Sequence, residues 1–406
     1  MLDAARRSGT HKRRRVVIGI LLTFVLWALF RPLAVSVAHA AGTGEDQNDG
    51  TDDILGALDG DALNELLAAL DGRALGLFGG SDFMSVLSRM VNGDLSFDPV
   101  TILDFVADVI GTSITGLLSL LVTVIAVAII YSVIGALKGG RVSEGVTKAV
   151  HFACIAAVIV VVGGATMDMF ASCSETLGVM SAQIDTVFPI MLTLMAAAGA
   201  SSTSSVFRPT LAVLTSGLFG LITAVLMPML IAAFVFGIVG NISEEVKLGK
   251  TADFFHGSVK WLFGTGFFLL TAFMSVQGIT ASVFDGIAVR SARFTIGKFV
   301  PVIGGYLSEG FNLVMSGSVI VKNALGYTSL ILLAATVLPV ILQTGIYSLC
   351  LKLAAAATEP LGDKLMSDML AGASKTVSMA GAVMTGAAFL YFVFILMVIS
   401  TGNIFL

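Results

Sequence analysis

The chain places a run of five hydroxyl side chains, followed by an arginine and a proline, between two apolar segments. These residues are Ser201, Ser202, Thr203, Ser204, Ser205, Arg208 and Pro209. Hydroxyls and a guanidinium can hydrogen-bond to water or to a polar solute. Irregular backbone at membrane depth is tolerated only where it is buried in protein or lines a cavity. The pattern has two interpretations: a turn that lines a solute path, or a structural turn whose hydroxyls bond the backbone.

A second polar segment follows a long apolar run and contains Glu359, Pro360, Asp363 and Lys364. Proline suits the first turn of a helix, where its missing N–H would be unpaired in any case. We therefore expect a new helix to start here, with Thr358 near its cap. The segment is either an ordered elbow used in assembly or a plain break between two spans.

Enzymatic and metal-binding motifs fail on inspection. Beyond residue 40 the only histidines are His151 and His256, which lie far apart, and no His-Glu-x-x-His zinc helix exists. Cys154, Cys173 and Cys350 have neither disulfide nor metal-ligand spacing. A glycine-rich phosphate loop ending in Lys-Ser or Lys-Thr is also absent. We expect no enzyme activity, no metal and no cofactor.

The composition is that of an integral membrane protein. Of 406 residues, 56% are hydrophobic and 12% are charged, whereas soluble domains carry about 25% charge. The mean hydropathy is +0.96. Because open sheet edges cannot be satisfied in lipid, the spans must be helices. The sequence therefore predicts an all-α, polytopic helical membrane protein embedded in the lipid bilayer.

The apolar runs are almost free of ionisable groups. Six stretches contain no Asp, Glu, Lys or Arg: 114–137, 150–162, 212–240, 262–275, 325–349 and 377–399. An ionisable side chain in lipid is costly and by default indicates a proton relay or ion pathway. Their absence from these stretches removes the simplest mechanism for a proton-coupled pump.

Residues 1–40 have the pattern of a cleavable signal peptide. A basic segment precedes the apolar core 16–30, Pro32 ends the core, and Ala38-His39-Ala40 supplies a small-x-small cleavage site. An uncleaved anchor is the alternative. Without residues 1–40 the chain keeps 16 bases and 26 acids. This acidic balance argues against nucleic acid as a partner.

Residues 41–111 form an acidic region that we predict to be extracytoplasmic and amphipathic-helical. Segment 41–110 holds fourteen acids against Arg73 and Arg89 alone, as the positive-inside rule expects outside the cytoplasm. Apolar residues recur at helical spacing in three groups: Leu63, Leu66, Leu67 and Leu70; Phe83, Val86, Leu87, Met90 and Val91; Ile102, Phe105, Val106, Val109 and Ile110. The apolar faces pack on each other or on the membrane surface, or they dock a partner.

Residues 112–406 are predicted to form a polytopic membrane domain with about seven spans. An acid-only loop is expected at Asp168, Glu175 and Asp185, after the second span. Segment 188–209 is a possible half-helix or re-entrant turn, because its 13 apolar residues are too few to cross. Segment 285–322 is a second possible re-entrant hairpin, or a packed amphipathic loop.

Charge sets the expected sides of the membrane domain. Four bases, Arg290, Arg293, Lys298 and Lys322, outnumber the acids in 285–323, which favours this segment on the cytoplasmic side. Seven spans then give a cytoplasmic carboxyl terminus. A re-entrant 188–205 would invert everything downstream.

Small residues are abundant in the spans, with 44 glycines in the chain. Ser378, Ala382 and Gly386 follow one another at four-residue spacing. Rows of small residues allow close approach of helices in lipid. They indicate packing within the bundle, or contacts in an oligomer.

An ordered series of short phrases over residues 185–403 resembles the stage III sporulation protein AE family. They include Phe188-Pro189, Val206-Phe207-Arg208-Pro209, Val276-Gln277-Gly278, Asp285-Gly286, Lys298-Phe299-Val300-Pro301, Leu325-Gly326-Tyr327, Lys352-Leu353-Ala354 and Glu359-Pro360-Leu361-Gly362-Asp363-Lys364. The signal peptide and the acidic segment match that family in layout only.

This resemblance implies a membrane component of the mother-cell complex in the outer forespore membrane. That complex joins a forespore partner to form a conduit between the two cells, so the implied partners are its other subunits and the forespore membrane protein. Residues 41–110 would face the intermembrane space. No catalytic residues are carried over.

Three functional hypotheses follow. The chain is a channel or permease-like subunit of the conduit, a non-conducting scaffold of the same complex, or a secondary transporter of an unrelated solute. Water access to 201–205 would distinguish the channel from the scaffold, and paired broken helices in inverted repeats would indicate the transporter.

Overall fold

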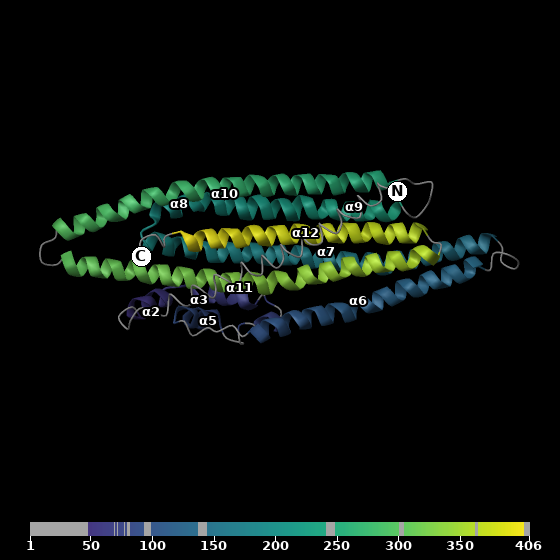
Figure 1. The fold of residues 1–406 in the computed structure, drawn as a ribbon, viewed down its shortest axis with the longest axis horizontal. Helices are drawn as coiled ribbons and strands as arrows, with labels where there is room; N and C mark the ends of the chain where they lie inside the picture. Colours follow the sequence, from purple (N-terminus) through teal and green to yellow (C-terminus); the bar gives the residue numbers. More distant parts are fainter. Residues whose placement is uncertain are drawn as a thin grey trace, which may run out of the picture.

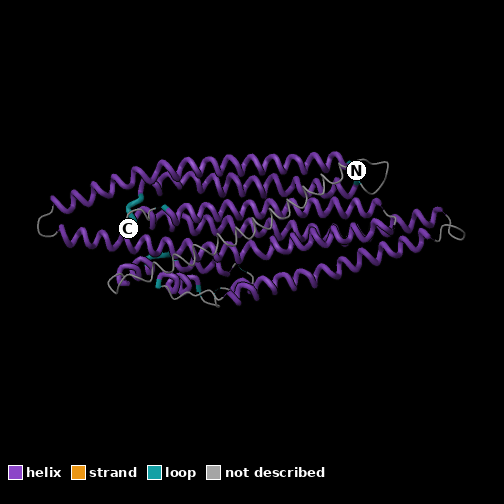
Figure 2. Tube along the Cα trace, in the orientation of Figure 1, coloured by secondary structure: helices purple, strands orange, loops and turns teal. Residues whose placement is uncertain are grey.

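A computed structural model describes residues 48–92 with short gaps, 99–136, 144–240, 248–299, 304–361 and 364–401. Over these residues the regular elements are helices, with no strand (Figure 2). The predicted all-α class is therefore confirmed. The predicted signal peptide, 1–40, lies outside the described residues.

The described elements follow the chain as a set of long helices joined by short connections. They are α2 (Asn48–Gly56), α3 (Gly60–Ala68), α4 (Gly72–Gly76), α5 (Phe83–Val91), α6 (Pro99–Ala136), α7 (Glu144–Ala197), α8 (Ser201–Ala212), the π-helical η3 (Val213–Phe219) and η4 (Ile222–Leu226), α9 (Met227–Val239), α10 (Gly249–Phe299), α11 (Gly304–Thr358), the 3-10 turn η5 (Glu359–Leu361) and α12 (Lys364–Ser400). Figure 1 shows the long helices lying nearly parallel in one elongated bundle.

Six helical stretches among the described residues are long and apolar enough to cross a membrane. They are Thr101–Ile130, Phe152–Ala197, Ser201–Val239, Gly249–Ser275, Leu313–Thr358 and Lys364–Ser400. The sequence had indicated about seven. An even number of crossings brings the start of α6 and the end of α12 to the same side, whereas seven would separate them.

The missing span is explained by α7, which is continuous. It runs for 54 residues, about 80 Å at 1.5 Å per residue, through both the expected acid-only loop and Pro189. Asp168, Glu175 and Asp185 are all exposed on this helix and do not form a separate loop. The prediction of a separate half-helix from residue 188 is wrong, because those residues complete a long helix.

Segment 285–322 was predicted as a re-entrant hairpin or a packed amphipathic loop, but its described residues belong to the long helices α10 and α11. Residues up to Phe299 continue α10, and residues from Gly304 begin α11. Figure 1 shows the ends of α10 and α11 extending beyond the α7–α8 turn at the left of the view. At the opposite end the α6–α7 hairpin extends beyond the start of α12 in the same way.

The amino-terminal helices pack on one another and on the membrane bundle. Leu63, Leu67, Phe83 and Leu87 are buried, as the helical spacing predicted, and the backbone N–H of Phe83 donates to Asn64 Oδ1 at 2.8 Å. Helices α2 and α5 contact α11, and α3 contacts α7. The third predicted amphipathic group is the first part of α6, which begins at Pro99 as its sequence indicated.

Helices α7, α11 and α12 form the densest part of the bundle. At Gly326 of α11 a Cβ would lie 2.5 Å from Ile399 Cγ1 of α12 and 3.0 Å from Met191 Cε of α7. One turn earlier, the buried Lys322 donates from Nζ to the carbonyl oxygens of Ile399, at 3.1 Å, and Thr401. We call this meeting of Lys322 and Gly326 with the end of α12 the α11–α12 joint.

Lys322 was counted among the bases that favour a cytoplasmic position for 285–323, and its position in the α11–α12 joint shows that this use was wrong. Its side chain is fully buried. It satisfies carbonyls that a helix end leaves without intrahelical partners, and its positive charge complements the negative end of the α12 dipole. Lys322 therefore carries no information about membrane side.

Candidate functional site

The hydroxyl run lies in the first turns of α8, immediately after a tight helical turn at Ala198–Ala200. Gly199 has φ of 90°, a conformation open to glycine without strain. The N–H of Gly199 donates to Ala196 O and that of Ala200 to Met195 O, both at 3.0 Å. This is the Schellman arrangement, which satisfies the last carbonyls of α7 and allows an immediate reversal into α8.

The five hydroxyls divide between the bundle interior and its surface. Thr203 and Ser204 are buried, while Ser201, Ser202 and Ser205 are exposed. Ser204 Oγ donates to Leu192 O of α7 at 2.8 Å, across the hairpin. Ser205 Oγ donates to Ser201 O at 2.9 Å, within its own helix. The turn lies at one end of the bundle, where α7 reverses into α8, and not midway along it (Figure 1).

The Ser204 bond gives a direct stability prediction. Ser204→Ala should lower the free energy of unfolding by about 1 kcal/mol, because it removes a buried hydrogen bond between α7 and α8. Ser205→Ala is the matched control, since its hydroxyl is exposed and its bond is local. Denaturant titration in detergent micelles measures both variants, and equal stabilities would contradict the structural role of Ser204.

Both α7 and α8 carry exposed residues that are polar or small. We call this set of residues the polar face. It consists of Asp168, Ala171, Glu175, Gly178, Ala182, Asp185, Pro189 and Thr193 of α7, with Ser201, Ser202, Ser205, Arg208 and Pro209 of α8. The α7 members recur every three or four residues, so they share one side of the helix.

Large apolar side chains are missing from this surface. Between Val160 and Val213 no described large hydrophobic residue is exposed. By contrast, α10 exposes Trp261, Phe268 and Leu269, and α6 exposes a row of leucine, isoleucine and valine side chains. The other long helices thus carry side chains suited to lipid, and the polar face does not.

Sequence reasoning found only part of this face. It singled out the residues of α8, including Arg208 and Pro209, but assigned Asp168, Glu175 and Asp185 to a loop. Their spacings of seven and ten residues, about 1.9 and 2.8 helical turns, keep them within one broad side of a helix and were the available signal.

The predicted elbow lies at the other end of α11. Glu359 and Pro360 are exposed in the 3-10 turn, and Lys364 is exposed at the start of α12. Asp363 lies outside the described residues. The Thr358 hydroxyl was expected near the cap of α12. It instead donates to Ala355 O of its own helix, α11, at 3.0 Å.

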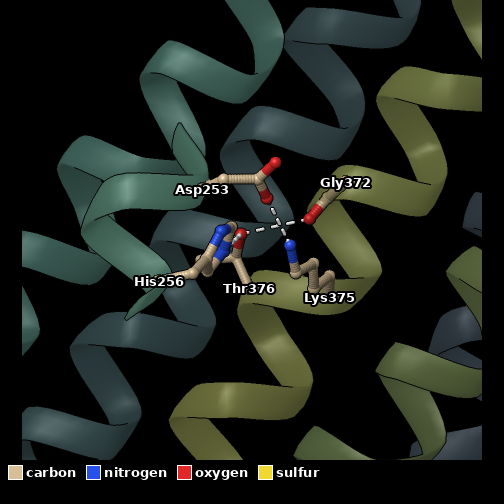
Figure 3. A network of polar contacts seen from close by, with 5 residues as sticks. All are labelled: Asp253, His256, Gly372, Lys375 and Thr376. Atoms are coloured by element: carbon tan, nitrogen blue, oxygen red, sulfur yellow. Dashed lines mark hydrogen bonds and ion pairs between the residues drawn. The ribbon is translucent and has the colours of Figure 1, made fainter. Parts of the chain in front are cut away.

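A polar network between α10 and α12 was not anticipated from the sequence (Figure 3). His256 is buried, and its Nε2 lies 2.8 Å from Thr376 Oγ1. Thr376 Oγ1 also donates to Gly372 O of its own helix at 3.1 Å. Beside it, Lys375 Nζ lies 2.6 Å from Asp253 Oδ1.

This network joins α10 to α12. The two sides are about 120 residues apart in the chain, which is why spacing gave no signal. Among the described residues, no group of three His, Cys, Asp or Glu could hold a metal ion. The exposed Asp253–Lys375 pair contributes little stability, because exposed ion pairs are screened by water.

Comparison with known proteins supplies the family. The family model for stage III sporulation protein AE matches residues 81–402, well over half of the chain. This chain belongs to the stage III sporulation protein AE family. It is similar to stage III sporulation protein AE of Bacillus subtilis (strain 168), with 26% identity over 321 residues, covering 78% of this chain and 80% of that protein.

The matched segment includes most of the structure described above. It begins just before α5 and covers α6 to α12, so the polar face, the elbow and the α11–α12 joint all lie within it. The family is described as a sporulation protein family. No solved structure matched this chain.

Proposed function

We propose that this protein is a channel or permease-like subunit of a conduit between mother cell and forespore, and that its polar face lines the solute path. Membership of the sporulation family supports the sporulation role over transport of an unrelated solute. In this proposal the protein lies in the outer forespore membrane, and α2–α5 face the intermembrane space. Its partners are the other subunits of the mother-cell complex and a forespore membrane protein.

The polar face is the observation that carries the proposal. On insertion scales an aspartate at the centre of a membrane helix costs about 2.5–3.5 kcal/mol. Three exposed carboxylates on one side of α7, flanked by small residues, are therefore unsuited to contact with lipid. Contact with water, or with another protein chain, removes this cost.

The packing of the bundle supports a path along the outside of α7 and α8. The interior is filled by large side chains such as Phe188, Tyr347, Tyr391 and Phe394, which have no solvent exposure. Phe188 and Phe394 have ring centroids 4.5 Å apart. A path along the polar face therefore needs a second wall, which we assign to another subunit of the complex.

Cysteine accessibility tests the proposal. After replacement of Cys154, Cys173 and Cys350, single cysteines are placed at Ala171 and Ala182 of the polar face. We expect both to react with a membrane-impermeant, negatively charged thiol reagent in assembled complexes, because a water-exposed thiol can ionise.

The matched control is Phe268→Cys on the apolar surface of α10, which should stay unlabelled. Labelling of Ala171→Cys and Ala182→Cys in the isolated protein but not in the complex would support the scaffold alternative, with a partner covering the face. No labelling in either the complex or the isolated protein would overturn both the channel proposal and the scaffold alternative. The elbow at Glu359, Pro360, Asp363 and Lys364 remains a predicted assembly site under either proposal.

A further inference from the structure

A shallow groove of about 450 Å³ lies on the outer surface of α10. Its lining residues are Gly257, Lys260, Trp261, Gly264, Thr265 and Phe268. A Cβ built at either of the two glycines, one heptad apart, would meet nothing within 4 Å. The groove therefore exists because the two glycines place no side chain beside the large rings of Trp261 and Phe268, which are 67% and 69% exposed.

The groove contains one cation without a described acidic partner. Lys260 is exposed, and no described residue forms an ion pair or hydrogen bond with it. Two turns earlier on α10, Asp253 is already paired with Lys375 of α12 at 2.6 Å. Lys260 thus leaves a positive charge available at the edge of an apolar groove.

The groove also crosses a boundary between polar and apolar surface. Before it, α10 carries Lys250, Asp253 and His256 in its first two turns; after Lys260 it has no charged residue up to Ser275. Tryptophan and lysine both favour the membrane interface, and a lysine stem can lie along apolar surface while its ammonium reaches the headgroups. This order places the Lys260 ammonium at the level of the lipid headgroups and the apolar part of the groove at the level of the acyl chains.

We propose that the α10 groove binds one anionic phospholipid, with the phosphate on Lys260 and an acyl chain along Gly264 and Phe268. Charge complementarity favours this occupant, because basic pockets at helix surfaces bind lipid headgroups. A transmembrane helix from another chain fits less well, since close helix pairs need rows of small residues and this surface projects Trp261 and Phe268. Helix α10 lies along one edge of the bundle (Figure 1).

The chain supplies its own probe for the test. Its two tryptophans are Trp27 and Trp261, so Trp27→Phe leaves Trp261 as the only one. The full-length chain is reconstituted in phosphatidylcholine vesicles that contain equal fractions of brominated phosphatidylglycerol or brominated phosphatidylcholine. Quenching of Trp261 fluorescence then reports which lipid occupies the groove.

We expect the brominated anionic lipid to bind about fivefold better than the zwitterionic one, the effect of one basic residue near an anionic headgroup. Lys260→Gln should abolish this preference, whereas Lys352→Gln, a matched change at an exposed lysine of α11, should preserve it. Equal quenching by both lipids, or a preference that survives Lys260→Gln, overturns the proposal. If neither lipid quenches Trp261, the groove is covered by protein and the proposal is wrong.

Discussion

Gly326→Val should lower the free energy of unfolding by about 3 kcal/mol, the upper end of the usual range for overpacking a core. The Cβ alone would lie 2.5 Å from Ile399 Cγ1 and 3.0 Å from Met191 Cε. Three helices meet at this point, so relief of the clash requires the buried side chains of Ile399 and Met191 to shift within a packed core. Thermal or denaturant unfolding in detergent micelles measures the loss.

The control for this prediction lies on the same helix. Gly345 is exposed, and a Cβ there would meet nothing within 4 Å, so Gly345→Val should have little effect. Gly386 is intermediate: its Cβ would meet the ring of Phe263 at 2.5 Å, and that ring can rotate away. Equal stabilities for the Gly326 and Gly345 variants would contradict the close packing at the α11–α12 joint.

Lys322→Met should release the end of α12. Hydrogen bonds to a charged group contribute roughly 1.5–3 kcal/mol each, and the variant loses those from Nζ to Ile399 O and Thr401 O. The cost of burying the lysine charge is removed at the same time, so we expect a net loss of about 2 kcal/mol. Faster amide hydrogen exchange in 397–401, measured by mass spectrometry, is the specific sign.

A second lysine on α11 provides the comparison. Lys352 is exposed, and Lys352→Met should leave exchange in 397–401 unchanged. Unaltered exchange in the Lys322 variant would mean that the carbonyls at the end of α12 do not depend on its ammonium. The Gly326 and Lys322 effects should not add, because both act on Ile399 and the same end of α12.

The local helical pattern was readable from the sequence. Leu63, Leu67, Phe83 and Leu87 recur at helical spacing and are buried. A short helix must hide its apolar side, and periodicity shows which side that is. The start of α6 at Pro99 followed from the same local rules.

The number of spans could not be predicted from the sequence, because it depends on whether a charged segment forms a loop or continues a helix. Asp168, Glu175 and Asp185 were expected in a loop, but all three are exposed on one side of α7. A helix can retain carboxylates wherever they reach water or another protein. Whether they do depends on neighbouring helices that are distant in sequence.

By itself, the sequence determined a helical membrane protein, since a chain this apolar can satisfy its backbone in lipid only through helices. Its ordered phrases also indicated the sporulation family, which the family match confirmed. Only the tertiary structure decided that Lys322 is a buried cap, that His256 bonds Thr376, and that three carboxylates of α7 and three hydroxyls of α8 are exposed. Each of these depends on contacts or exposure set by how distant helices pack, and periodicity within one helix does not contain that information.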